Sequence, residues 1–247
     1  YKNAWLKIYD MPVMYFPKFF HPDPSVKRQS GFLKPSFGDS RLLGASINAP
    51  YFHVISDSAD LTVKPRIFSA NRYLLQSEYR KVTKNSSNII DFGVNNDDQR
   101  TANGTKTHFF LNSLINLNLS NLNNSKLDIK LERTSNDGYL KLYSLEDENS
   151  IIQDTSTLES LIQFTTDKNN LTFKASFEAY ETLGQLNSNR YEFIYPNYSL
   201  QKSLDLDSNI FKNLDFTSYG NQRTHTTNIK EAVQINDLIL SSSMGLI

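Results

Sequence analysis

The chain has 247 residues, which suits one large all-β domain or two smaller domains. Its 26 basic and 26 acidic residues cancel, so the overall charge does not indicate a nucleic-acid partner. The absence of cysteine excludes disulfides and thiolate metal sites within these residues. No run of about 18 apolar residues occurs, so a transmembrane helix is not expected. A mean hydropathy of −0.48 still allows a transmembrane β-barrel, because each barrel strand has one wet face.

The first residues are expected to be extended. Trp5, Lys7 and Tyr9 alternate with Leu6 and Ile8, which is the period of a strand. Prolines follow in a cluster, at Pro12, Pro17, Pro22, Pro24, Pro35 and Pro50. Because proline is disfavoured in helices and in the middle of sheets, the segment from His21 to Gln29 is predicted to be a linker.

From Gly31 onward, apolar residues recur with a period of two, in about twelve segments separated by polar turns. In the hairpin formed by residues 61–80, the polar face carries four charged residues. These residues, Lys64, Arg66, Glu78 and Arg80, are candidates to face a hydrated lumen. Cross-strand ion pairing on a wet surface is the alternative for them.

The connections alternate in length, which is the layout of an outer-membrane barrel. Short turns are expected at 57–60, 85–87, 120–125 and 167–170, and longer polar loops at 95–106, 134–158 and 203–212. Within the second long loop, GYLKLYSLED could form a short helix. A soluble β-sandwich or propeller has the same period of two and stays open as an alternative, with the apolar face as a dry core. Long strands and aromatic residues at strand ends favour the barrel.

No motif for catalysis or metal binding is present. None of the four histidines, His21, His53, His108 and His225, is spaced with a second histidine or a carboxylate as a metal site requires. The acidic stretch 95–98 lacks the glycine and glutamate of a calcium loop and is expected to be solvated. We therefore predict a protein that is not an enzyme and needs no cofactor.

Residues 11–80 resemble the LptD family of lipopolysaccharide-assembly outer-membrane proteins. The resemblance is carried by MPVMYFPKFFHPDP from residue 11, VKRQSGFLKPSFG at 26–38, INAPYF at 47–52, ADLTVKPR at 59–66 and LLQSEYR at 74–80. It implies that residues 1–27 are the end of a periplasmic β-jelly roll and a linker. Residues 28–247 would then be the N-terminal part of an antiparallel transmembrane β-barrel, about twelve strands of a larger barrel.

The resemblance also implies a function and a location in the cell outer membrane, with a periplasmic N-terminal portion. The family moves lipopolysaccharide into the outer leaflet through a laterally opening barrel. The implied partners are lipopolysaccharide, an LptE-like plug lipoprotein, an LptA-like periplasmic bridge and outer-membrane lipid, with no nucleic acid. A general or substrate-specific porin is the main alternative, and a soluble β-sandwich binding module is a further one.

Two groups of residues take roles from this resemblance. Pro35 and Pro50 would lie on the first two barrel strands and weaken backbone pairing at the lateral gate. The alternative is that these two prolines only mark strand ends. The junction between the two domains would be formed by Pro17, Pro22, Pro24, Lys27, Arg28 and Gly31.

Overall fold

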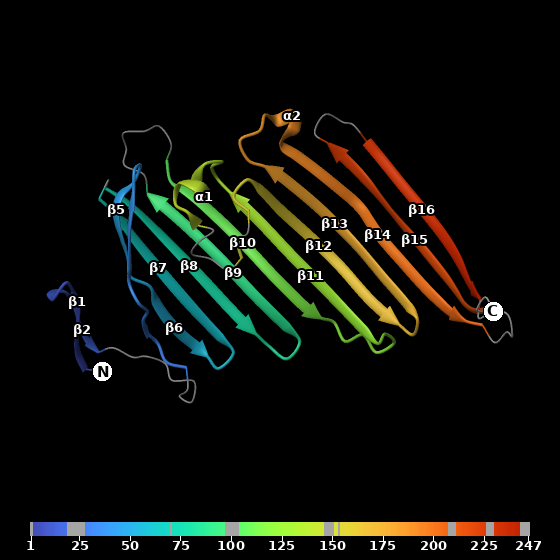
Figure 1. The fold of residues 1–247 in the computed structure, drawn as a ribbon, viewed down its shortest axis with the longest axis horizontal. Coiled ribbons are helices and arrows are strands. Elements are labelled where there is room, and N and C mark those ends of the chain that lie inside the picture. Colours follow the sequence, from blue (N-terminus) through green and yellow to red (C-terminus); the bar gives the residue numbers. More distant parts are fainter. Residues whose placement is uncertain are drawn as a thin grey trace, which may run out of the picture. The chain divides into compact units, whose positions relative to one another are not determined.

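The computed structural model describes residues 2–18, 28–69, 71–96, 104–145, 151–152, 154–206, 211–225 and 230–242. Most of these residues lie in antiparallel strands, as Figure 1 shows. The predicted all-β antiparallel fold is therefore confirmed. In this part of the chain, neither short helix has the length or the apolar character needed to cross a bilayer.

The chain divides into two compact units. The first comprises Tyr1–Lys81 and Ile90–His108, and the second comprises Val82–Ile89 and Phe109–Ile247. Strands β8 (Arg72–Val82), β9 (Ser86–Asn96) and β10 (Lys106–Asn116) therefore contribute residues to both units.

The first unit begins with a two-stranded sheet of β1 (Lys2–Ile8) and β2 (Met11–Lys18). Its other strands are β3 (Gly31–Phe32), β4 (Ser36–Ser40), β5 (Gly44–Asn48), β6 (Tyr51–Ser56), β7 (Ala59–Phe68) and β8. Strand β3 pairs with β6 and β4 pairs with β5, while both β5 and β6 pair with β7. Residues 31–40 and 44–56 thus form one hairpin in which each arm is interrupted.

The second unit continues as antiparallel strands that each pair with their chain neighbours. These strands are β11 (Asn124–Thr134), β12 (Thr157–Lys168), β13 (Leu171–Thr182), β14 (Tyr191–Asp205), β15 (Phe211–His225) and β16 (Lys230–Ser242). A tilted strand needs ~9–11 residues to span a bilayer. All six strands are long enough, since β11 has 11 residues and the others have 12 to 15. Helix α1 (Tyr139–Leu142) confirms the short helix predicted within GYLKLYSLED, and α2 (Asn187–Arg190) precedes β14.

Consecutive antiparallel strands place their connections alternately at two ends. In the second unit, 117–123 and 169–170 lie at one end, while 135–145, 154–156 and 183–190 lie at the other. The prediction of a long loop at 203–212 is wrong. The β14–β15 ladder continues as far as Asp205 opposite Asn213, because Leu204 and Leu214 extend the pairing beyond the expected turn.

The strands combine buried polar residues on one face with exposed apolar residues on the other. On β7 and β8, Asp60, Gln76 and Glu78 are at most 7% exposed, whereas Ile67 and Tyr73 are 55% and 54% exposed. Strands β12 and β13 likewise expose Ile162 and Phe177, by 53% and 60%. Successive strand residues point to opposite faces, so each face has a consistent character along these strands. A dry sandwich core would have the reverse arrangement.

Candidate functional site

The two prolines predicted for a gate lie at the interruptions of the first hairpin. Pro35 immediately precedes β4 and Pro50 immediately precedes β6. The flanking register pairs are Phe32 with Tyr51 and Ser36 with Asn48, so three residues (33–35) face two (49–50). This is the geometry of a β-bulge. The extra residue breaks the expected alternation through Leu33, Pro35 and Phe37. Proline also has no N–H to continue the ladder at this point.

Backbone pairing across this bulge is sparse. Across it, the Leu33 N–H donates to the Pro50 carbonyl at 2.8 Å, whereas the Ala49 N–H donates to the Pro65 carbonyl of β7 at 3.2 Å. Within the described residues, β4 has β5 as its one strand partner. The first hairpin of this unit is thus a sheet edge whose internal pairing is weakened halfway along.

The predicted junction residues are described only in part. Pro22, Pro24 and Lys27 lie outside the described residues, while Pro17 lies in β2 and Gly31 opens β3. Arg28 forms an ion pair with Asp60, and its guanidinium carbon lies 5.5 Å from the centroid of the Phe52 ring. Arg28 therefore ties the residues just before β3 to strands β6 and β7.

Three of the four candidate lumen residues belong to one ion-pair network. Arg80 Nε lies 2.9 Å from Asp60 Oδ1 and 3.5 Å from Glu78 Oε1. Lys64 Nζ lies 3.4 Å from Glu78 Oε2. Asp60 was missed by the sequence analysis, although it shares the alternating face of Lys64 on β7. These contacts are the cross-strand ion pairs that the sequence offered as the alternative to a lumen-facing role for these residues.

The fourth candidate, Arg66, contacts a different set of groups. Its Nε lies 3.5 Å from Ser46 Oγ, and its guanidinium carbon lies 5.1 Å from the Phe68 ring centroid. Ser46 Oγ in turn lies 3.4 Å from the Gly38 carbonyl oxygen. Arg66 therefore connects β7 to the β4–β5 hairpin.

A buried polar cluster in the first unit was also missed. His108 Nε2 contacts Asp91 Oδ1, and Gln76 Nε2 lies 3.4 Å from both carboxylate oxygens of Asp91. All three residues are at most 1% exposed. His108 and Asp91 are 17 positions apart, so their contact depends on strand pairing and is invisible to motif spacing.

The second unit carries a polar network across β11, β12 and β13. Lys130 Nζ lies 3.0 Å from Glu132 Oε1 and 2.8 Å from Glu159 Oε2, and the Glu159 backbone N–H donates to Glu132 at 2.8 Å. The Tyr180 hydroxyl lies 3.2 Å from Glu159 and donates to Glu178 at 3.0 Å. Glu132 and Glu159 are therefore bonded across the β11–β12 pair, while Glu178 is bonded by Tyr180 of its own strand.

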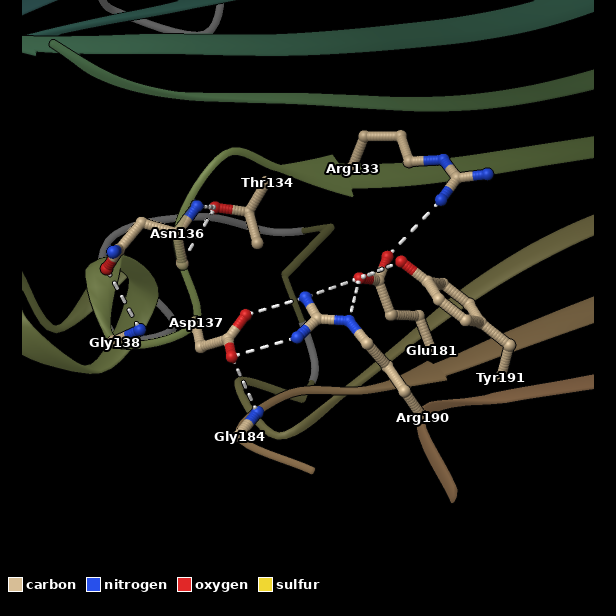
Figure 2. Close-up of polar contacts among 9 residues, drawn as sticks. All are labelled: Arg133, Thr134, Asn136, Asp137, Gly138, Glu181, Gly184, Arg190 and Tyr191. Atoms are coloured by element: carbon tan, nitrogen blue, oxygen red, sulfur yellow. Dashed lines mark hydrogen bonds and ion pairs between the residues drawn. The ribbon is translucent and has the colours of Figure 1, made fainter. Parts of the chain in front are cut away.

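At the end where the long loop lies, Arg190 joins two carboxylates (Figure 2). Its guanidinium makes two bonds to Asp137, at 2.7 and 3.0 Å, in the bidentate arrangement that gives arginine–carboxylate pairs their strength. The Gly184 N–H donates to the same carboxylate at 3.0 Å. On its other side, Arg190 Nε donates to Glu181 at 2.8 Å. We call Asp137, Glu181, Gly184 and Arg190 the loop clamp.

The clamp fixes the first residues of loop 135–156. Six described apolar residues of this loop are almost fully buried, between 0% and 3% exposed: Tyr139, Leu140, Tyr143, Leu145, Ile151 and Ile152. The rings of Tyr139 and Tyr143 meet edge to face, with centroids 5.4 Å apart. The expectation of a long polar loop at 134–158 is therefore wrong for these residues, because their apolar side chains form a packed segment.

The clamp has a predictable pH dependence. The hydrogen bonds from Arg190 lower the pKa of Asp137 below its usual 3.8, and the Gly184 N–H acts in the same direction. A lowered folded-state pKa means that the stabilisation is complete above the ordinary value and is lost as the pH falls through the folded-state value. We expect hydrogen exchange of the Gly184 amide, taken relative to the intrinsic rate at the same pH, to accelerate below about pH 4 in the full-length protein. Asp137→Asn should remove that acid-dependent increment, and an unchanged increment in this variant would contradict the assignment.

Among the described residues, no group of three or more histidine, cysteine, aspartate or glutamate side chains could hold a metal ion. Asn95 and Asn96 end β9, and Asp97 and Asp98 of the acidic stretch lie outside the described part of the chain. The contacts described above join neighbouring strands or fix the loop to them.

Long antiparallel strands with a polar face and an exposed apolar face define a piece of a transmembrane β-barrel. The family model described as LptD protein matches residues 1–237, and the chain belongs to the LptD family.

The relatives that this chain resembles carry the name LPS-assembly protein LptD. The Pseudomonas aeruginosa (strain UCBPP-PA14) protein is 35% identical over 38% of this chain and 10% of its own length. The Pseudoalteromonas translucida protein is 32% identical over 56% and 18%, and the Legionella pneumophila (strain Lens) protein is 26% identical over 75% and 23%. The chain therefore spans between a tenth and a quarter of the length of these relatives.

Proposed function

We propose that this chain supplies the first strands of an outer-membrane barrel that moves lipopolysaccharide into the outer leaflet by opening sideways. The relatives named LPS-assembly protein support the substrate. The observation that carries the lateral opening is the first hairpin, whose two arms are interrupted at Pro35 and Pro50. Each backbone bond that is not made removes roughly 1 kcal/mol from the seam. A seam weakened in this way can part while the other ladders stay intact.

The exposure pattern supports a membrane location. The polar face with Asp60, Glu78 and Lys130 would line a hydrated lumen, and the exposed Ile67 and Phe177 would meet lipid. A soluble sandwich would leave these apolar side chains in water, which makes that alternative the weaker one. Residues 1–27 would be the periplasmic end of the jelly roll, reached by an LptA-like bridge.

The packed loop 135–156 also bears on the porin alternative. A general porin needs an open aqueous channel, whereas this loop buries six apolar side chains and is fixed by the clamp. We propose that the loop and an LptE-like lipoprotein together obstruct the lumen, and that the protein is not an enzyme. Low ion conductance of the purified full-length complex is the expected result, and large open-channel conductance would favour a porin.

The proposed gate is tested with Pro35→Ala combined with Pro50→Ala in the full-length protein. Both replacements return an N–H to the hairpin, so the seam should tighten and lipopolysaccharide delivery to the cell surface should slow by roughly tenfold. Pro12→Ala, in β2, is the matched control and should leave delivery unchanged. Normal delivery in the double variant, at normal protein levels, would count against a lateral gate at this hairpin.

A further inference from the structure

Strand β7 carries a proline directly beside the interrupted hairpin. The register between the hairpin and β7 runs through Ile47 opposite Ile67 and Asn48 opposite Arg66, and resumes at Tyr51 opposite Val63. Continuing the same register places Ala49 opposite Pro65. The Ala49 N–H does donate to the Pro65 carbonyl, at 3.2 Å.

This bond is one half of a pair that proline cannot complete. In an antiparallel ladder, two residues that form a hydrogen-bonded pair exchange both of their N–H···O bonds. The return bond would run from residue 65 to the Ala49 carbonyl, and proline has no N–H to make it. The neighbouring pair of Leu33 and Pro50 is incomplete for the same reason, since Leu33 donates at 2.8 Å to a residue that cannot donate back.

The incomplete pairs separate two differently attached parts of the hairpin. Strands β4 and β5, residues 36–48, reach β7 through the pairs of 46–48 with 66–68 and a bond from the Ser69 N–H to the Ala45 carbonyl at 2.8 Å. Strands β3 and β6 are attached on the other side of the break, where β6 pairs with residues 59–63. The interruption therefore lies at one level of the sheet, in both arms of the hairpin and, at Pro65, in β7.

We infer that Pro65 is the third member of a line of prolines, with Pro35 and Pro50, and that residues 36–48 form a flap hinged at this line. The inference rests on the proposed lateral opening and deepens it, since it names the part that moves. The flap swings away from β7 by breaking the few bonds at 45–48. Residues 28–33 and 51–56 stay attached to β7, where Arg28 also pairs with Asp60. Opening therefore does not require the whole first hairpin to leave the sheet.

The first test is Pro65→Ala in the full-length protein. The new N–H can complete the pair with Ala49, so lipopolysaccharide delivery should slow by roughly fivefold, as expected for one restored hydrogen bond. Val63→Ala is the matched control, because it removes a side chain from the same face of β7 without adding a donor. Slowing in both variants, or in neither, would overturn the role of Pro65.

The second test locks each side of the break with a cysteine pair in the full-length protein, and residues 1–247 hold no cysteine that would compete with it. Ile47→Cys with Ile67→Cys joins the flap to β7, and His53→Cys with Leu61→Cys joins β6 to β7. Directly opposite strand residues lie close enough for cross-linking with small adjustments. Delivery should fall when the first pair is oxidised and recover on reduction, whereas the second pair should have no effect. Equal effects of both locks would overturn the flap.

The results of these tests distinguish a wrong inference about Pro65 from a wrong proposal of lateral opening. If Pro35→Ala with Pro50→Ala slows delivery but Pro65→Ala does not, the gate stands and the third proline is excluded. If no proline variant slows delivery and the flap lock has no effect, the lateral opening itself is overturned.

Discussion

Full-length protein carrying Lys130→Met is expected to lose its folded, heat-modifiable form at a clearly lower temperature than the unaltered protein. Lys130 lies between two carboxylates, 3.0 Å from Glu132 and 2.8 Å from Glu159, and Glu132 is only 5% exposed. Without the ammonium group, Glu132 keeps its backbone bond from Glu159 but faces the second carboxylate without a cation between them. Leaving a buried charge without its partner is costly, and the partial exposure of Lys130 and Glu159 reduces the loss to about 2–3 kcal/mol.

The matched control for this change is Lys126→Met. Lys126 lies on β11 four residues before Lys130, so it points to the same face, and it is exposed. The chemical change is identical, but no buried carboxylate depends on Lys126 in the described contacts. We expect the free energy of unfolding of this variant to change by no more than about 0.5 kcal/mol. Equal destabilisation by both changes would mean that removing a positive charge, rather than breaking the network, is responsible.

The period of two was enough to predict which residues share a face. It placed Lys64, Arg66, Glu78 and Arg80 on the polar side of one hairpin, and the structure shows three of them in one network. It could not show that Asp60 joins Arg28 to that network. That contact depends on where the chain returns after the linker, which is set by pairing of β3 with β6.

Contacts between residues that are distant in the sequence could not be predicted, for a related reason. Arg190 meets Asp137 across 53 positions, and the role of Pro65 depends on Ala49 lying opposite. Neither follows from spacing, because cross-strand register is fixed by the whole ladder. Loop 135–156 did carry a readable signal. Tyr139, Leu140 and Tyr143 have helical spacing within GYLKLYSLED, where a short helix was expected, but the burial of the loop was not expected.

Arg190→Met is expected to release loop 135–156. Arg190 is 19% exposed and holds Asp137 and Glu181 together, so its loss leaves two carboxylates near each other without their shared cation. Hydrogen bonds to charged groups are worth about 1.5–3 kcal/mol each, and solvent exposure of Asp137 places the net cost near the lower part of that range. A cost of about 2 kcal/mol raises the open population of the loop by roughly thirtyfold.

Release of the loop has two measurable consequences in the full-length protein. Protease should cut within 135–156 much faster, because the residues around Tyr139 and Ile151 leave their buried positions. If the loop obstructs the lumen, cells should also become sensitive to large hydrophilic antibiotics. Arg223→Met is the matched control, since Arg223 forms a more exposed ion pair with Glu192 at 2.7 Å, and such pairs contribute at most about 1 kcal/mol. Fast cleavage without antibiotic sensitivity would show that the clamp orders the loop but that the loop does not seal the barrel, whereas unchanged cleavage would mean that apolar packing alone holds it.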